Sequence, residues 1–370
     1  MPGWLVITGS YYRDSDPIYS SYRDSDPIYW ELGSLSLDLR AHDTCTTMVP
    51  FSMVTTGGMD SLRTPVGVSR AEWAFAINLE NALLNTSAIN GWKLFWLVTV
   101  SISVGMVIAM ATSNLSTGAG VSAMVQLSVR CSVPLLFLVF SASATQVLFP
   151  SPFSRWLLRN RKYLGLAFAA AMAWQALFIL WLVIAYTDYY ADEVYVLRDA
   201  IEGLIGYVFL LAMAVTSFSR TRKYLNPRQW RLLHLSGIYF LWAYAFSTYW
   251  WSLYYYSDPV LLDNVFYWSG FAAWALRATA WGKRRAQAAP GTDVAVAGVR
   301  GLRLAGFAVI AIGLCVVAFG TGWQRFAAET LYGYAFTTIP EMYLPFWPFE
   351  PFLPLALILG GVYLVTRYRG

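Results

Sequence analysis

The chain has 370 residues, of which 57% are hydrophobic and 13% are charged, and its mean hydropathy is +0.48. Soluble proteins carry about a quarter of their residues as charged side chains, so this composition excludes an ordinary soluble domain and indicates an integral membrane protein. The formal net charge is +5, and the two histidines, His42 and His234, exclude chemistry that requires a histidine cluster.

Residues 1–92 are predicted to form an acidic cytoplasmic segment. They carry five Lys or Arg and ten Asp or Glu, which leaves 21 basic and 11 acidic residues for 93–370. The sequence YRDSDPIY occurs twice, at Tyr12–Tyr19 and Tyr22–Tyr29, and two copies are too few for a solenoid. The repeat is either a short duplication in a polar tail or a docking segment, and translation starting at Met59 would make it dispensable.

Eight apolar stretches predict membrane-spanning helices, because about 20 apolar residues cross a hydrocarbon layer of roughly 30 Å. They are residues 93–112, 122–148, 163–187, 200–218, 231–252, 262–281, 302–320 and 352–366. Before the last, the prolines between Pro340 and Pro354 predict an irregular aromatic segment at the membrane interface. The predicted fold class is all-α, a polytopic membrane protein whose transmembrane domain is 93–370.

The connections between these stretches alternate in charge. Basic residues gather in the second, fourth and sixth connections, at Arg155–Lys162, Arg220–Arg231 and Lys283–Arg300, and acidic residues occupy the connections between them. Because Lys and Arg mark cytoplasmic loops, the alternation predicts that both termini are cytoplasmic. Membrane lipid is the expected partner of the basic loops, in preference to nucleic acid.

Aromatic residues gather at the predicted outer ends of two stretches. They are Tyr249, Trp250 and Trp251 in the fifth, and Tyr186, Tyr189 and Tyr190 at the end of the third. Trp and Tyr are typical of the interface between lipid and water, so we expect an interfacial belt rather than a cage around a ligand.

Arg130 lies inside the second stretch, where a charge is costly unless it is paired, and it is therefore a functional candidate. Arg277 is expected to extend its charge toward the cytoplasmic headgroups. We place no Asp or Glu at the middle of a stretch, which disfavours a proton-coupled transporter. Three distant cysteines, Cys45, Cys131 and Cys315, form no zinc-binding spacing with histidine, so no metal site is predicted.

Two stretches carry a resemblance to a known family. They are RNRKYLGLAFAAAMAWQALFILWLV from Arg159 to Val183, and LLAMAVTSFSRTRKYLNPRQWRLLHLSGIYFLWAYAFSTYW from Leu210 to Trp250. Together they resemble the ferric-reductase-like transmembrane domain, most closely the haem-bearing membrane subunit of the bacterial methionine sulfoxide reductase system. The resemblance covers roughly residues 120–285. It implies a helical bundle in a bacterial inner membrane, with b-type haem between its third and fifth helices.

The resemblance also implies where the haem ligands belong, and this chain departs from that pattern. Two neutral imidazoles hold a low-spin haem that carries electrons. Of the three expected histidines only His234 is present, because the other two positions hold Gln175 and Ser247. Arg130 matches an arginine of the second core helix. The candidate cofactor-binding residues are therefore His234 as a single axial ligand, with Gln175, Ser247 and Arg130, for haem b or a quinone.

This pattern favours an accessory membrane subunit or ligand-binding protein, built on a degenerate ferric-reductase-like bundle. We expect Gln175 and Ser247 to hydrogen-bond across the interface that haem would fill. Aromatic residues are expected to fill the remaining volume, namely Trp174, Tyr239, Trp242, Tyr244 and Phe246. The alternative is a transmembrane electron-transfer subunit, with haem b or quinone, of an oxidoreductase system.

Neither reading predicts an enzyme active site in this chain. The sequence holds no catalytic constellation and no nucleotide-binding glycine motif, so a redox role would require a separate reductant-binding protein or a membrane quinol. A protein partner or a larger membrane complex is therefore expected.

Overall fold

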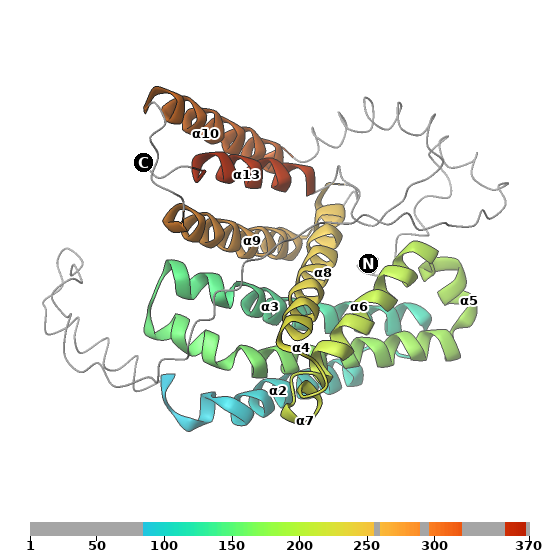
Figure 1. Ribbon diagram of the computed structural model, residues 1–370. Coiled ribbons are helices and arrows are strands. Elements are labelled where there is room, and N and C mark those ends of the chain that lie inside the picture. Colours follow the sequence, from blue (N-terminus) through green and yellow to red (C-terminus); the bar gives the residue numbers. More distant parts are fainter. Residues whose placement is uncertain (1–83, 255–259, 289–295, 320–351, 368–370) are drawn as a thin grey trace, which may run out of the picture. The chain divides into compact units, whose positions relative to one another are not determined.

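The computed structural model describes residues 84–254, 260–288, 296–319 and 352–367; the repeat and most of the proline-rich segment lie outside these ranges. Within them the chain is helical and has no strand (Figure 1), which confirms the all-α class. Among the described residues, four helices are long and apolar enough to cross a membrane. They are α2 (Gly91–Thr112), α3 (Gly118–Leu148), α4 (Pro152–Ala185) and α10 (Val296–Ala318), the last from Gly298 onward. These helices support a membrane protein.

Four further helices coincide with the other predicted stretches. They are α6 (Leu197–Val215), α8 (Pro227–Tyr254), α9 (Leu261–Ala288) and α13 (Phe352–Val365). Short elements precede α2 and join the longer helices: η2 (Ser87–Ile89), α5 (Thr187–Tyr189), the π-helical η3 (Tyr190–Val194) and α7 (Ser219–Arg222). Each predicted stretch therefore overlaps a helix over most of its described residues.

Helix α4 begins well before the predicted stretch 163–187. The Ser151 hydroxyl accepts a hydrogen bond from the Ser154 backbone N–H at 3.1 Å, and the Ser154 hydroxyl accepts one from the Ser151 N–H at 2.9 Å. This capping box, with Pro152 in the first turn, starts the helix. The predicted basic connection Arg155–Lys162 is therefore helical. At 1.5 Å per residue α4 is about 51 Å long, so its basic turns reach beyond the apolar part.

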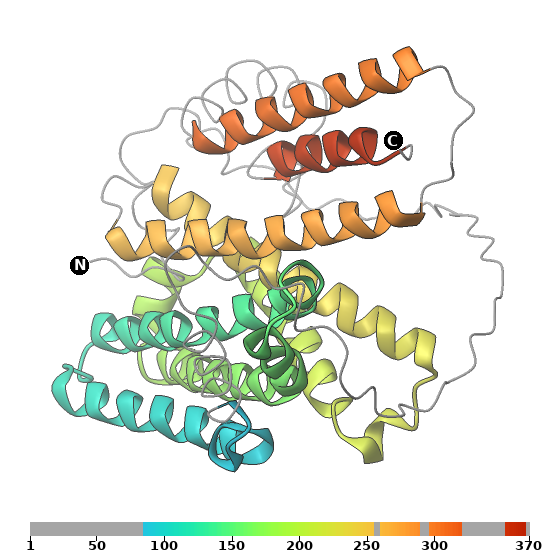
Figure 2. The same cartoon turned by 90° about the vertical axis from the view of Figure 1, so that its left-hand side faces the viewer.

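Helix α3 lies at the centre of the packing. It contacts α4, α8 and α9, while α2 packs on α4, and α6 packs on α8 and α4 (Figures 1 and 2). Of the apolar window of α3, 67% is buried, against 11% for α2, which leaves most of α2 available to lipid. Helices α10 and α13 lie side by side, and α13 also contacts α9.

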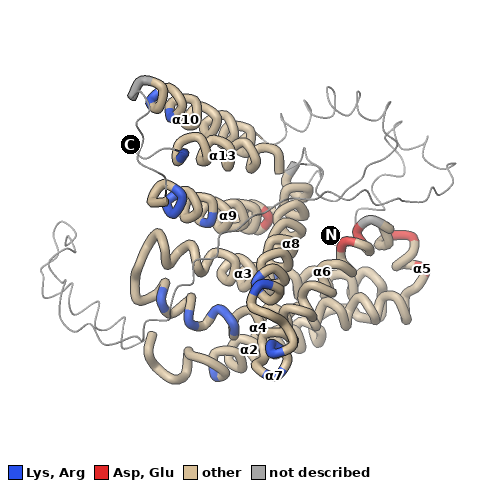
Figure 3. The backbone as a smooth tube through the Cα atoms, in the orientation of Figure 1, with Lys and Arg blue, Asp and Glu red and all other residues tan. Residues whose placement is uncertain are grey.

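Charged residues separate along the described helices (Figure 3). Acidic residues occupy the segment after α4, the start of α6 and the start of α9, namely Asp188, Asp192, Glu193, Asp199, Glu202 and Asp263. Basic residues instead gather at the start of α4, on α7 and at the start of α8. Because α4 carries basic residues at its start and is followed by acidic ones, the two signs lie at opposite ends of this helix.

Candidate functional site

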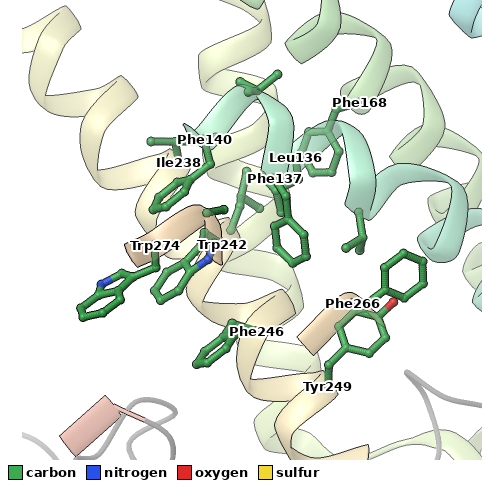
Figure 4. Packing of buried hydrophobic residues seen from close by; sticks show 14 of the residues in the cluster. Leu136, Phe137, Phe140, Phe168, Ile238, Trp242, Phe246, Tyr249, Phe266 and Trp274 are labelled. Carbon is green, nitrogen blue, oxygen red and sulfur yellow. The ribbon is translucent and has the colours of Figure 1, made fainter. Parts of the chain in front are cut away.

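A stack of four aromatic rings fills the interior between α3, α8 and α9. Adjacent ring centroids are 5.2 Å apart for Phe140 and Trp242, 5.1 Å for Trp242 and Phe246, and 5.0 Å for Phe246 and Tyr267, with interplanar angles of 12–13°. All four side chains are buried. Figure 4 shows Phe140, Trp242 and Phe246 pointing into one interior region. Two of the five expected filling residues, Trp242 and Phe246, lie in this stack, which we call the ring stack. The stack joins α3, α8 and α9, whereas the filling was expected between α4 and α8.

A close approach of α8 and α9 holds the ring stack in place. The Trp242 indole N–H donates a 2.9 Å hydrogen bond to the backbone carbonyl of Gly270. A Cβ added at Gly270 would lie 2.9 Å from Phe137 Cζ and 3.2 Å from Phe246 Cδ2, inside ordinary contact distance. Glycine at this position therefore lets the backbone of α9 reach the indole.

Arg277 closes one side of the ring stack. Its guanidinium carbon lies 4.5 Å from the ring centroids of both Phe140 and Tyr239, and its Nη1 donates a 3.1 Å hydrogen bond to the Phe140 carbonyl. Cations over aromatic faces are attracted by the ring quadrupole. Arg277 of α9 therefore binds α3 and α8, whereas the sequence predicted only an extension toward headgroups.

Gln175 is buried, with 6% of its surface exposed, and it joins α4 to α6. Its Oε1 accepts a 2.9 Å hydrogen bond from the Tyr207 hydroxyl, which also lies 3.3 Å from the Met172 carbonyl. The Met172 sulfur accepts a 3.2 Å hydrogen bond from the Ser132 hydroxyl. Gln175 and Met172 lie at or near the haem-ligand position expected in the third predicted stretch, which is α4. Both therefore bond to neighbouring helices, Gln175 to α6 and Met172 to α3.

Ser247 bonds within its own helix and not to Gln175. Its hydroxyl donates a 3.0 Å hydrogen bond to the Tyr244 carbonyl, as serine commonly does inside a helix. The expected bond between Gln175 and Ser247 is wrong, because Tyr207 of α6 supplies the partner of Gln175. Trp174 also lies apart from the ring stack, since its indole N–H donates to Ser103 of α2 at 3.1 Å.

His234 sits where α6, α7 and α8 meet. Its Nε2 is 3.1 Å from the Thr216 hydroxyl, and its ring centroid is 4.3 Å from that of Trp230. The Trp230 indole N–H donates to the Thr216 carbonyl at 3.2 Å, and the Arg222 guanidinium lies 4.6 Å from the Trp230 ring. The imidazole therefore belongs to a basic and aromatic cluster.

Arg130 lies in the electrostatic field of a buried carboxylate. Asp263 is 0% exposed; its Oδ2 accepts a 2.9 Å hydrogen bond from the Val260 N–H, and its Oδ1 accepts none. Arg130 interacts electrostatically with both Asp263 and the buried Tyr249. Glu202 of α6 is buried as well. Both acidic residues lie near the starts of their helices, so the described helices hold buried carboxylates near their ends and none at the middle of a predicted stretch.

Two aromatic residues of the predicted outer belt point inward. Tyr249 and Trp250 are 3% and 2% exposed, and the Tyr249 ring lies 5.0 Å from that of Phe266 (Figure 4). For these two residues the belt prediction is wrong, because Tyr249 packs on Phe266 of α9 and Trp250 is buried in the core rather than exposed to lipid.

Sequence reasoning missed several residues that organise these regions. Phe140, Tyr267 and Tyr207 carry no motif and are single aromatics among 63 in the chain (17 Trp, 24 Tyr and 22 Phe). The one available signal was Asp263, an acidic residue two positions into a predicted apolar stretch, where a partner is required.

The donor atoms present do not fit a haem held by two imidazoles. Gln175 Oε1 is engaged by Tyr207, Ser247 bonds its own helix, and His234 Nε2 contacts Thr216. No protein-family model matches the chain, and no curated protein or solved structure proved similar to it. The resemblance to the ferric-reductase-like domain therefore stays a prediction.

Proposed function

We propose that this chain is a non-catalytic accessory subunit of a membrane complex, built on a degenerate ferric-reductase-like bundle whose interior is packed with aromatic rings. The observation that carries the proposal is the ring stack of Phe140, Trp242, Phe246 and Tyr267. These rings pack against one another at about 5 Å and join α3, α8 and α9 into one interior, which suits a structural role.

The polar side chains support the same reading. Gln175 bonds Tyr207, and Arg277 binds Phe140 and Tyr239. Each contact joins two or more helices, and polar contacts of this kind stabilise helix association within membranes. A bundle whose polar groups are used for internal contacts suits binding to a partner better than chemistry.

The proposed topology has eight spans with both termini in the cytoplasm. Eight helices coincide with the eight predicted stretches. The separation of acidic and basic residues along α4 agrees with the charge alternation of the sequence (Figure 3). The membrane is proposed to be a bacterial inner membrane on the basis of the family resemblance.

An absorbance spectrum tests the absence of haem. The full chain is expressed with a haem precursor in the medium, purified in mild detergent and scanned across the Soret region. We expect no haem band, and the same spectrum from the His234→Ala variant. A Soret band with about one haem per chain, lost in His234→Ala, would overturn the proposal in favour of an electron-transfer subunit.

Native electrophoresis tests the accessory role. Membranes from the source cells are solubilised in mild detergent, and the chain is detected by an antibody. We expect it to migrate in an assembly well above 41.5 kDa plus detergent, containing a second polypeptide that co-migrates under two detergents. A chain that migrates alone, and that by itself oxidises or reduces a quinone, would exclude the accessory role.

A further inference from the structure

The basic residues at the start of α4 and at the junction of α6, α7 and α8 converge on one region. Arg161 and Arg222 both act electrostatically on His234. Lys162 Nζ lies 5.6 Å from the Phe218 ring centroid and 6.0 Å from that of Trp92, so it shares this region. We call Arg161, Lys162, Arg222 and His234 the basic cluster.

The positive charge of the basic cluster lacks a described counterion. Arg161 is half-buried, and its charged neighbour is Arg277, another half-buried arginine. The six described acidic residues lie after α4 and at the starts of α6 and α9, away from this end of the helices. A positive charge partly removed from water, such as that of Arg161, is costly unless an anion pairs with it.

The basic cluster also lies where lipid headgroups lie. Arg161 and Lys162 directly precede the apolar run of α4 that starts at Tyr163, so their charges lie at the edge of the hydrocarbon layer. Trp92 and Trp230 flank them, as tryptophans flank the interface of membrane proteins. An anion that pairs with these charges must therefore lie at the depth of the lipid headgroups.

We propose that the basic cluster binds the phosphate of an anionic phospholipid. The guanidinium groups of Arg161 and Arg222 offer planar pairs of N–H donors that match phosphate oxygens, and Lys162 adds a point charge. The rings of Trp92, Phe218 and Trp230 cover the apolar side of the headgroup region. This binding does not depend on the accessory role and would hold for an electron-transfer subunit as well.

Native mass spectrometry of the full chain tests the proposal. The delipidated protein is titrated with phosphatidylglycerol, phosphatidylcholine or inorganic phosphate. The test variant is Arg161→Gln with Arg222→Gln. The matched control is Lys283→Gln with Arg300→Gln, which removes the same charge from exposed positions on α9 and α10. We expect the wild type to prefer phosphatidylglycerol and the test variant to bind it roughly 10- to 30-fold more weakly, with the control within about twofold of wild type.

Three outcomes would overturn the proposal. The first is an equal loss in the test and control variants, which would mean diffuse attraction by net charge. The second is competition by inorganic phosphate as strong as that of the lipid, which would assign the site to a soluble anion. The third is equal affinity for phosphatidylcholine.

If the double variant does not fold, Arg222→Gln alone is used, because this side chain is exposed. Unchanged binding in a folded Arg222→Gln protein would likewise contradict the proposal.

Discussion

Single buried polar side chains connect the helices of this protein. Gln175 joins α4 to Tyr207 of α6, and Arg130 of α3 acts on Asp263 at the start of α9. Inside a bilayer such groups cannot hydrogen-bond to water, so the positions of their protein partners influence how the helices pack. Polar contacts between membrane helices contribute about 0.6–2 kcal/mol each, and a charge that loses its partner costs more.

At this scale we predict that Arg130 and Asp263 depend on each other. Asp263→Asn removes the carboxylate charge that acts on Arg130 and weakens the bond from the Val260 N–H, so the free energy of unfolding should fall by about 1 kcal/mol. Arg130→Gln should cost a similar amount. The double variant should lose clearly less than the sum of the two single changes.

Reversible unfolding in mixed detergents measures these losses. Asp192→Asn is the control, because Asp192 is exposed and lies beyond α4. Strict additivity of the Arg130 and Asp263 variants would show that the two side chains are independent.

Helices pair through two kinds of surface. Aromatic rings join α3, α8 and α9, whereas glycines join α10 and α13. A Cβ added at Gly361 would lie 2.6 Å from the Gly306 carbonyl oxygen, and one added at Gly306 would lie 2.9 Å from the Gly361 carbonyl oxygen. Aromatic rings fill a wide space between helix axes, whereas glycines, which have no side chain, allow two helix backbones to approach closely.

The ring stack should be the most sensitive part of the interior. Trp242→Ala removes its second ring and the indole bond to Gly270, which should lower the free energy of unfolding by about 3–5 kcal/mol. Trp281→Ala is the matched control, because the Trp281 side chain is 40% exposed on α9. Thermal unfolding followed by a thiol-reactive dye compares the two. Equal losses would refute a structural role for the ring stack.

The glycine contact between α10 and α13 gives a sharper comparison. Gly361→Ala should push the helices apart and lower the midpoint of thermal unfolding by several degrees, since the new Cβ would meet backbone atoms of α10. Gly360→Ala places the same group where nothing lies within 4 Å. A methyl group there should leave the midpoint unchanged or raise it. Similar effects of the two variants would contradict close packing at Gly361.

Over the whole molecule, charge and hydropathy set the orientation in the membrane. The described basic residues at the start of α4, on α7 and at the start of α8 lie opposite the acidic residues that follow α4. Lys and Arg are retained on the cytoplasmic side during insertion. The basic end is therefore expected to face the cytoplasm, and the acidic end the other compartment.

Cysteine labelling tests this orientation. Lys223→Cys and Asp192→Cys are placed separately in a chain whose Cys45, Cys131 and Cys315 are replaced by serine. A membrane-impermeant maleimide added outside intact cells should label Asp192→Cys only, because Lys223 belongs to the basic end. Added to inside-out vesicles, it should label Lys223→Cys only. Labelling of both from one side would refute the topology.

The all-α class and the approximate position of each long helix in the described ranges could be predicted from hydropathy and charge. The positions of α2, α3 and α10 followed from long, mostly apolar runs, which form helices when they cross a bilayer one by one. Helix starts were less accurate, as α4 shows, because polar residues outside the hydrocarbon layer extend a helix when a cap such as Ser151 precedes them.

Which side chains contact one another could not be predicted before the packing of the helices was known. From the sequence, Gln175 and Ser247 formed one pair, yet α6 supplies the partner of Gln175 through Tyr207. Tyr249 and Trp250 have the composition of an interfacial belt, yet α8 directs them into the bundle. Hydropathy indicates that a side chain is removed from water. It does not indicate whether that side chain faces lipid or the protein interior, because both are apolar. The choice between them therefore depends on helix rotation, which packing sets and the linear sequence does not express.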